Sequence, residues 1–173
     1  GGGGLISGIA IAAKAINPDI KIIGVVSSGA TAMKESYKSQ MPLDSKSVRT
    51  IADGIAVKNV NPKLLNIIID YVDHIVEVTD NEIANAILFL LEKHKLVVEG
   101  AGAVATAAIM HDKIEMDDTK VCAVVSGGNI DVTMLAQIIE KGLVKSSRKM
   151  NLMVTLMDKP GSLTHLSEIF REC

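Results

Sequence analysis

The sequence predicts an α/β fold in which helices flank a mostly parallel sheet. Short apolar runs of strand length alternate along the chain with segments in which apolar residues recur at helical spacing. This alternation favours parallel strands joined by helical crossovers. With 173 residues, 48% of them hydrophobic, the chain is long enough for one ordinary core and a small appended piece.

The first part of the chain begins with a glycine turn. Small and apolar residues at helical spacing follow it, and they predict a helix within 1–16 that ends before Pro18. The apolar run at 21–26 predicts a buried strand, and a short helix at about 30–39 follows a Ser/Gly loop. The polar stretch up to Thr50 is predicted to be a loop.

The middle of the chain carries one strong local signal. Thr79 and Glu82 form the capping-box pattern, in which two side chains satisfy free backbone N–H groups reciprocally, so a helix is predicted from there to about His94. Periodicity and β-branched content predict the elements around it. These are helices at 62–71, 100–110 and 131–141, and strands at 74–78 and 120–125, with a tight loop at 126–129.

The composition changes after Gly142. The residues that follow are polar, then alternate like a strand at 150–157, and a turn at 158–161 leads into a helical pattern at 163–170. The predicted organisation is therefore a first domain at 1–142, a linker at 143–149 and the beginning of a second domain at 150–173.

Composition excludes several classes of partner. The formal net charge is −2 and basic residues are scattered among acidic ones, so neither nucleic acid nor an anionic membrane is an expected partner. Two Tyr and two Phe are too few to form a stacking platform for bases. The apolar stretch at 5–13 is too short to span a bilayer. Cys122 and Cys173 have neither metal-binding spacing nor a disulfide framework, which fits a reducing cytoplasm.

The glycine run from Gly1 to Gly4 predicts an anion site. A glycine costs about 1 kcal/mol relative to Ala in a helix interior, so close approach of the backbone to a ligand explains the run better. Bare N–H groups in a turn at a helix N-terminus bind phosphate. The dinucleotide pattern G-x-G-x-x-G is absent, and Gly8 is not followed by the Lys of a P-loop, so the phosphate of another cofactor is favoured. A cloning linker or a flexible tail is the alternative.

Two further segments combine polar side chains with glycines. Ser126 follows a predicted strand, where open α/β sheets bind ligands, and it is either a ligand contact or part of a structural turn. Because no G-x-S-x-G motif surrounds it, Ser126 is not predicted to be a nucleophile. Glu99 precedes a helix of small residues and is either a carboxylate favoured by the helix dipole or a buried acid at a site. The four histidines have no metal-binding spacing.

Four motifs, in their order and spacing, resemble the fold-type II family of enzymes that depend on pyridoxal phosphate (PLP). The resemblance is specifically to threonine dehydratases and their serine dehydratase and serine racemase relatives. It covers roughly residues 1–142 and implies part of the large domain of that fold. The motifs are GGGGL at 1–5, TIADG at 50–54, VEGAGA at 98–103 and SGGNID at 126–131.

The resemblance implies a PLP site. In that family the tetraglycine loop holds the cofactor phosphate and a serine hydrogen-bonds the pyridine nitrogen. A hydroxyl at that place, unlike a carboxylate, does not enforce a fully protonated ring, and this agrees with the β-elimination typical of the family. Carried over residue by residue, the cofactor-binding set is Gly1, Gly2, Gly3, Gly4, Leu5, Gly54, Glu99 and Ser126.

The chain departs from the family pattern in two ways. Metal-binding relatives carry acidic residues just after the strand that corresponds to 21–26, whereas 26–32 contains no carboxylate, so no metal is predicted. The family's Schiff-base lysine precedes the glycine loop in a Ser-Phe-Lys-like motif that this chain lacks. No catalytic residue is therefore expected within the chain, which we expect to be a C-terminal fragment that is inactive alone.

The residues after the linker resemble the first strand and helix of an ACT domain, a regulatory βαββαβ module. Such domains bind small amino acids at a glycine turn, so the predicted regulatory contacts are Pro160, Gly161 and Leu163, together with Asn129. An ordinary strand-turn-helix is the alternative. Because ACT domains commonly pair, the resemblance implies an amino-acid effector and a homodimer or homotetramer.

For the whole protein, the resemblance implies PLP-dependent deamination of L-threonine, and of L-serine, by β-elimination. The products would be 2-oxobutanoate or pyruvate, with ammonia. One alternative is another fold-type II enzyme: the ACT-like segment disfavours a serine racemase, and the dehydratase-like run at 126–131 disfavours most β-replacement synthases. The other is a non-catalytic amino-acid-binding fragment, which the missing lysine favours for this polypeptide.

Overall fold

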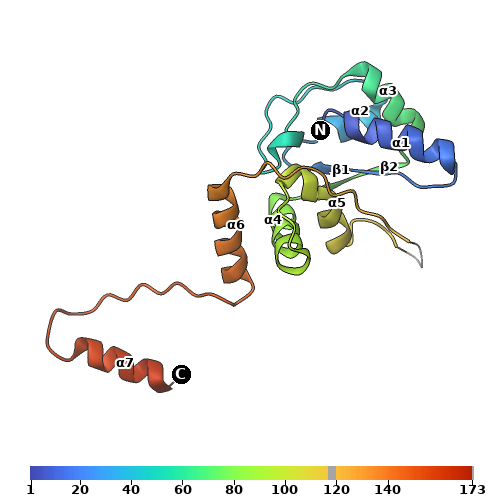
Figure 1. The fold of residues 1–173 in the computed structure, drawn as a ribbon. Helices are drawn as coiled ribbons and strands as arrows, with labels where there is room; N and C mark the ends of the chain where they lie inside the picture. Colours follow the sequence, from blue (N-terminus) through green and yellow to red (C-terminus); the bar gives the residue numbers. More distant parts are fainter. Residues whose placement is uncertain (117–119, 173) are drawn as a thin grey trace. The chain divides into compact units, whose positions relative to one another are not determined.

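The computed structural model describes residues 1–116 and 120–172 (Figure 1). The chain divides into two compact units, Gly1–Gly142 and Leu143–Cys173. Unit 1 contains the sheet and the residues of all four sequence motifs. Unit 2 contains helix α7 (Ser162–Glu172) and the segment that leads to it. That unit 2 begins an ACT domain stays a prediction.

Unit 1 is built around a parallel pair of strands, as the alternation of elements predicted. Strand β1 (Ile23–Ser27) pairs with β2 (His74–Val78) in a register that runs from Ile23 opposite His74 to Ser27 opposite Val78. The helices are α1 (Gly4–Ile16), α2 (Ala32–Ser39), α3 (Pro62–Tyr71), α4 (Asp80–Phe89), α5 (Gly100–Met110) and α6 (Val132–Lys145), with a 3₁₀ turn η1 (Asp53–Ile55) and a π-helical turn η2 (Leu90–His94).

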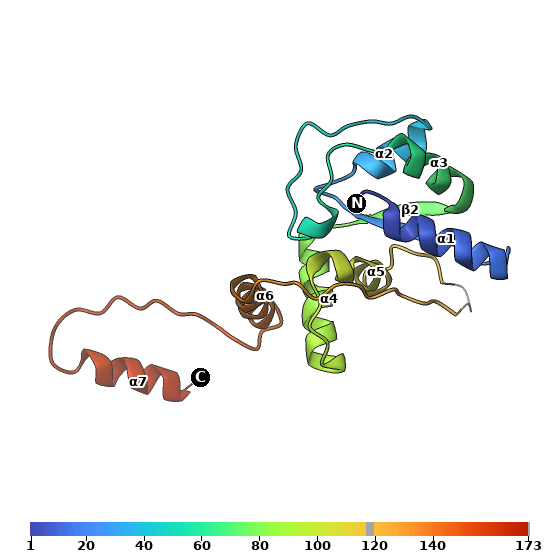
Figure 2. The ribbon, with the colours of Figure 1, turned by 45° about the horizontal axis from the view of Figure 1, so that its top comes forward.

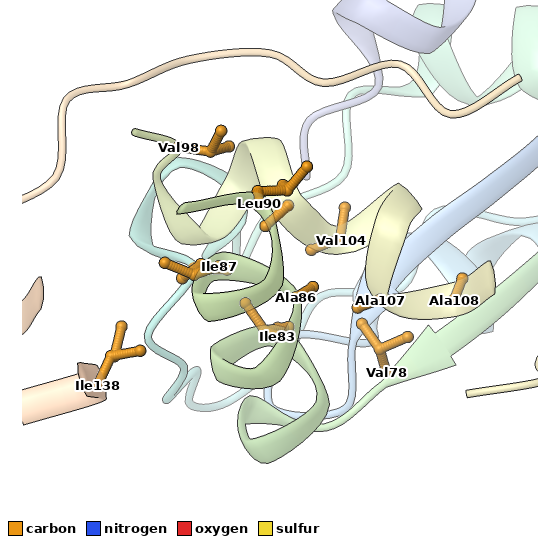
Figure 3. Packing of buried hydrophobic residues seen from close by; sticks show 12 residues of the cluster. Val78, Ile83, Ala86, Ile87, Leu90, Val98, Val104, Ala107, Ala108 and Ile138 are labelled. Carbon is orange, nitrogen blue, oxygen red and sulfur yellow. The ribbon is translucent and has the colours of Figure 1, made fainter. Parts of the chain in front are cut away.

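Helices cover both faces of the sheet (Figure 2). On one face α1, α2 and α3 pack around a core that includes Val26 and Ile68. On the other face α4 and α5 pack around a second core that includes Ile83 and Val104 (Figure 3). Val25 packs against this second core, because successive residues of a strand point to opposite faces of the sheet. The flanked parallel sheet confirms the predicted α/β fold.

Helix α5 lies close against its neighbours because its buried residues are mostly small. Glycines and alanines at these positions let the backbone of α5 approach the sheet and α4, and Figure 3 places Ala107 and Ala108 beside Val78 of β2. The fully or nearly fully buried small residues of the helix are Gly100, Gly102, Ala103, Ala107 and Ala108.

The capping box predicted at Thr79 is present at the start of α4. The Glu82 N–H donates to Thr79 Oγ1 at 3.3 Å, and the Thr79 N–H donates to Glu82 Oε2 at 2.7 Å. Glu82 Oε1 pairs with Lys113 Nζ at 2.8 Å, which ties α4 to the residues that follow α5. Burial raises the pKa of Glu82, but the hydrogen bonds from Lys113 and Thr79 outweigh this effect and lower the pKa to about 2.

Two predicted strands, at 120–125 and 150–157, are wrong. The structure assigns no strand to either segment, and β1 and β2 pair with each other alone among the described residues. Val124 is 45% exposed and Met153 is 97% exposed, so neither apolar run is covered. A β-branched or alternating run makes a strand only when a neighbouring strand accepts its backbone hydrogen bonds, and neither segment has one within the part of the chain described.

The remaining helix predictions are confirmed, with shifted ends. Helix α6 continues to Lys145, so part of the predicted linker is helical, and the assignment of 143–149 as a linker stays a prediction. The described residues contain no helix with the length and apolar character needed to cross a bilayer.

Candidate functional site

The glycine turn forms the N-terminus of α1. Gly3 is the N-cap residue with a φ of 89°, in the left-handed region, and no side chain caps the first turn. A Cβ atom at Gly3 would lie 2.6 Å from Cδ1 of the buried Ile68, so packing as well as conformation requires glycine there. At Gly2 and Gly4 a Cβ would meet nothing within 4 Å. The first-turn N–H groups of α1 thus have no side-chain cap, and no side chain fills the space beside Gly2 and Gly4, an arrangement that suits an anion.

The glycine turn lies against η1, which carries the second motif. A Cβ at Gly1 would lie 3.0 Å from Cγ2 of Ile55, the last residue of η1. Leu5, predicted to continue the glycine loop, lies in the first turn of α1 with its side chain 61% exposed. The first motif thus contacts the residue that directly follows the second motif.

A polar network that the sequence analysis missed fixes the start of the second motif. The buried Ser27 at the end of β1 donates its hydroxyl to Thr50 Oγ1 at 2.8 Å, and Thr50 Oγ1 donates to Asp80 Oδ1 at 2.5 Å. Asp80 Oδ2 also accepts the Ile51 N–H at 3.2 Å. The network joins β1, the 50–54 loop and α4. Thr50 and Asp80 are 30 residues apart, and no local pattern indicates that they meet.

Glu99 is the N-cap residue of α5, but its carboxylate does not cap its own helix. Glu99 Oε2 accepts the Asn129 N–H at 3.1 Å, and the Glu99 N–H donates to the Gly127 carbonyl oxygen at 3.3 Å. The side chain is half-buried. The sequence left open whether Glu99 is a carboxylate favoured by the helix dipole or a buried acid at a site. Its place at the N-terminus of α5 fits the first interpretation, but its hydrogen bonds go to the fourth motif.

Glycines on two segments surround the Glu99 carboxylate. Gly127 has a φ of 78°, and a Cβ there would lie 2.3 Å from Glu99 Oε1. A Cβ at Gly54 would lie 3.5 Å from the same oxygen and 3.0 Å from Cβ of Ala101. The second, third and fourth motifs are therefore in contact around one carboxylate.

Ser126 is half-buried and its backbone packs on the first turn of α5. A Cβ at Gly102 would lie 1.6 Å from the Ser126 carbonyl oxygen, so the two backbones touch and only glycine fits. Ser126 thus follows an irregular segment and not the predicted strand, and α5 provides its support.

A pocket of about 290 Å³ lies next to Glu99. Its walls come from the 50–54 loop, the start of α5, the loop that follows Ser126 and the start of α6. Hydrogen bonds that Asp131 accepts from the Thr133 side chain and backbone lower the pKa of Asp131. The lining residues are Ile51, Asp53, Glu99, Gly100, Asn129, Ile130, Asp131 and Met134.

The predicted regulatory residues fall in both units. Asn129 lies in unit 1, where its N–H is bonded to Glu99. In unit 2, Gly161 has a φ of 91° in the turn before α7, and the adjacent Ser162 Oγ donates to the Met157 carbonyl oxygen at 2.9 Å. Pro160 lies in this turn and Leu163, 72% exposed, lies in the first turn of α7. Among the described residues no three His, Cys, Asp or Glu side chains are grouped to hold a metal ion.

Relatives with known names cover almost the whole chain. The L-threonine ammonia-lyase of Thermotoga maritima (strain ATCC 43589 / DSM 3109 / JCM 10099 / NBRC 100826 / MSB8) is 47% identical over 172 residues, which are 99% of this chain and 43% of that protein. The L-threonine ammonia-lyase of Geobacter sulfurreducens (strain ATCC 51573 / DSM 12127 / PCA) is 44% identical over 167 residues, 96% of this chain and 42% of that protein. The chain thus spans less than half the length of these relatives.

Solved structures share the fold. The crystal structure of a T.th. threonine deaminase has a TM-score of 0.72 and 32% sequence identity, over 76% of this chain and 48% of that one. The structure of maize serine racemase has a TM-score of 0.73 and 35% identity, over 84% of this chain and 46% of that one. The family model described as "Pyridoxal-phosphate dependent enzyme" matches residues 1–127, a stretch that holds the glycine turn, the Glu99 segment and Ser126. The chain therefore belongs to the family of pyridoxal-phosphate dependent enzymes.

Proposed function

We propose that the protein containing this chain deaminates L-threonine, and also L-serine, by β-elimination. Loss of the Cα proton and the β-hydroxyl removes one water, and hydrolysis of the released enamine takes up one water to give 2-oxobutanoate or pyruvate and ammonia, so water does not appear in the net reaction. One observation carries the proposal: the 47% identity over 99% of this chain to a relative named L-threonine ammonia-lyase.

The glycine turn is the proposed site of the cofactor phosphate. Backbone N–H groups at the start of α1 lack a side-chain cap, and no Cβ obstructs the space beside Gly2 and Gly4. The positive end of the helix dipole favours a dianion at this place. We expect the residues from Gly1 to Leu5 to hold the phosphate through their backbone, and packing within the protein also requires glycine at Gly3.

Ser126 is the proposed partner of the pyridine nitrogen. PLP supplies the electron sink that eases loss of a Cα proton. The Ser126 hydroxyl can donate or accept a hydrogen bond and brings no charge, so it orients the ring without fixing its protonation as a carboxylate would. Gly54 and Glu99 complete the proposed cofactor-binding set.

The Schiff-base lysine is proposed to lie outside this chain. Covalent chemistry in the family needs such a lysine, and no lysine here stands in a Ser-Phe-Lys-like motif. Relatives extend well beyond the aligned region, since the chain covers only 43% of the Thermotoga maritima protein. We therefore expect no turnover by these 173 residues alone.

Unit 2 is proposed to begin an ACT domain that binds an amino-acid effector and pairs with a second copy, in a homodimer or homotetramer. The glycine turn before α7 supports this assignment, with Pro160, Gly161 and Leu163 as the effector contacts. Asn129, the other predicted regulatory residue, donates its N–H to Glu99, so we expect any regulatory effect of Asn129 to act through Glu99.

The test is an assay of the complete protein with L-threonine and L-serine. Keto-acid formation supports the proposal, and removal of the Ser126 hydroxyl in Ser126→Ala should lower kcat/KM by about tenfold or more, whereas Ser47→Ala at an exposed position should not. Racemisation of L-serine without keto acid would identify a racemase instead. That second candidate is favoured by the similarity to maize serine racemase, with its TM-score of 0.73.

A further inference from the structure

We propose that Glu99 is a positioning residue that holds the loop from Ser126 to Asn129 against the start of α5 and so fixes where the Ser126 hydroxyl lies. This inference rests on the proposed function, in which Ser126 faces the cofactor ring. In this inference Glu99 belongs to the cofactor-binding set through Ser126 and makes no direct contact with the cofactor or the reacting atoms.

Glu99 forms hydrogen bonds with the loop at two points. Its backbone N–H donates to the Gly127 carbonyl oxygen at 3.3 Å, and its carboxylate accepts the Asn129 N–H at 3.1 Å. These two bonds lie on either side of Gly128, so the loop cannot rotate about a single attachment. Ser126 directly precedes Gly127, the first of the two bonded residues.

Glu99 is itself held in place. Its carbonyl oxygen accepts the N–H groups of Gly102 and Ala103, each at 3.1 Å, as the first turn of α5 forms. The preceding Val98 is only 3% exposed and belongs to the core between α4 and α5. Glu99 thus lies at a helix start and next to a core residue, so its own position is fixed. Its hydrogen bonds can therefore hold in place a loop that has no regular structure.

The space around the carboxylate matches a glutamate. Gly127 lies so close that a Cβ would be 2.3 Å from Glu99 Oε1, and Gly54 stands on another side at 3.5 Å by the same measure. An aspartate is one methylene shorter and would not reach Asn129 from the same backbone position. A glutamine keeps an oxygen acceptor for Asn129 but loses the charge that strengthens the bond.

The loop has a second support that does not depend on the carboxylate. Gly102 lets the Ser126 carbonyl oxygen approach the first turn of α5, where a Cβ would be only 1.6 Å away. Loss of the Glu99 side chain should therefore loosen the loop around Asn129 without unfolding unit 1. Variants of Glu99 can therefore test its effect on the loop without a large change in the free energy of unfolding.

The first measurement is amide hydrogen exchange in the complete protein for peptides that contain Gly127 to Asn129. Glu99→Ala should speed exchange there by about tenfold or more, and Glu99→Gln by less, because loss of a charged acceptor frees the amide. Glu77→Ala is the matched control, since Glu77 lies on β2 and pairs with Lys34 of α2 instead of with the loop. Unchanged exchange in Glu99→Ala would overturn the proposal, whatever reaction the enzyme catalyses.

The second measurement is a double-mutant cycle on kcat/KM and on the absorbance spectrum of the bound cofactor. If Glu99 acts through Ser126, Glu99→Gln should lower kcat/KM in the wild-type background and change it little in a Ser126→Ala background. The cofactor spectrum should shift in both single variants and no further in the double variant. Equal effects of Glu99→Gln in both backgrounds would show that Glu99 acts independently of Ser126, and the proposal would be wrong. Absence of deamination by the wild-type protein would instead refute the proposed function and leave the exchange result valid.

Discussion

The variant Glu82→Gln should lower stability at neutral pH and have little effect in acid. Glu82 closes the capping box at α4 and pairs with Lys113 at 2.8 Å, with 17% of its side chain exposed. Gln can still accept the Thr79 N–H bond, but it carries no charge for Lys113. The variant therefore isolates the charged part of the interaction.

The expected size follows from the pKa of Glu82. Burial raises this pKa, yet the bonds from Lys113 and Thr79 lower it overall from 4.5 to about 2. At about 1.4 kcal/mol per tenfold change in proton affinity, the difference corresponds to about 3.5 kcal/mol, and solvent screening reduces the expected effect to about 1–3 kcal/mol. Because the folded state has the lower pKa, this stabilisation is complete above pH 4.5 and is lost as the pH falls through about 2.

Urea unfolding of wild type and variant at about pH 7 and about pH 3 measures this difference directly. The difference in free energy of unfolding between wild type and variant should be smaller at about pH 3. At that pH Glu82 is largely protonated in the unfolded state but still largely ionised in the folded state. Glu77→Gln is the control, because Glu77 is 47% exposed in its pair with Lys34 and should contribute less than about 1 kcal/mol. A wild-type advantage of equal size at both pH values would refute the reasoning.

Three further perturbations test other contacts of unit 1. Asp80→Ala leaves the Thr50 hydroxyl and the Ile51 N–H without their acceptor, so urea unfolding should show a loss of about 2–4 kcal/mol, and a loss under about 0.5 kcal/mol would contradict the network. Gly3→Ala should lose about 1–2 kcal/mol from its φ of 89° and weaken PLP binding in an absorbance titration, while Gly8→Ala, whose Cβ meets nothing within 4 Å, should do neither. Asp73→Asn should lose about 1 kcal/mol at neutral pH, with a smaller loss in acid. Burial raises the Asp73 pKa, but the Ile22 N–H and Lys14 lower it overall, so its stabilising effect disappears only as the carboxylate protonates.

Local signals predicted the helices well. The capping box at Thr79 and Glu82 acts within one helical turn, so the sequence alone contains both partners of the interaction. The wrong strand at 120–125 shows the opposite case. Its β-branched residues satisfy the pattern of a buried strand, but pairing depends on a neighbour elsewhere in the fold, and the segment is irregular where described.

The sequence motifs named the proposed members of the candidate site but not the contacts between them. The four motifs identified Glu99 and Ser126, yet the bond from the Asn129 N–H to Glu99 joins residues 30 positions apart. The link from Thr50 to Asp80 spans the same separation, and no motif singled out Asp80 as part of the site. Side-chain contacts between loops depend on the packed positions of α4 and α5, which periodicity does not determine.

Glycines in the four motifs serve two different purposes, and this distinction changes how the motifs are interpreted. Gly102 and Gly127 make room for protein atoms, since a Cβ at either would lie within 2.3 Å of Ser126 or Glu99. At Gly2 and Gly4, at the start of α1, a Cβ would meet nothing within 4 Å, so packing within the protein does not require glycine there. A glycine-rich motif is therefore evidence for a ligand only where its glycines are not already used by the protein. By that criterion the first motif is the proposed anion site, while the glycines of the third and fourth motifs make room for the Ser126 carbonyl oxygen and the Glu99 carboxylate.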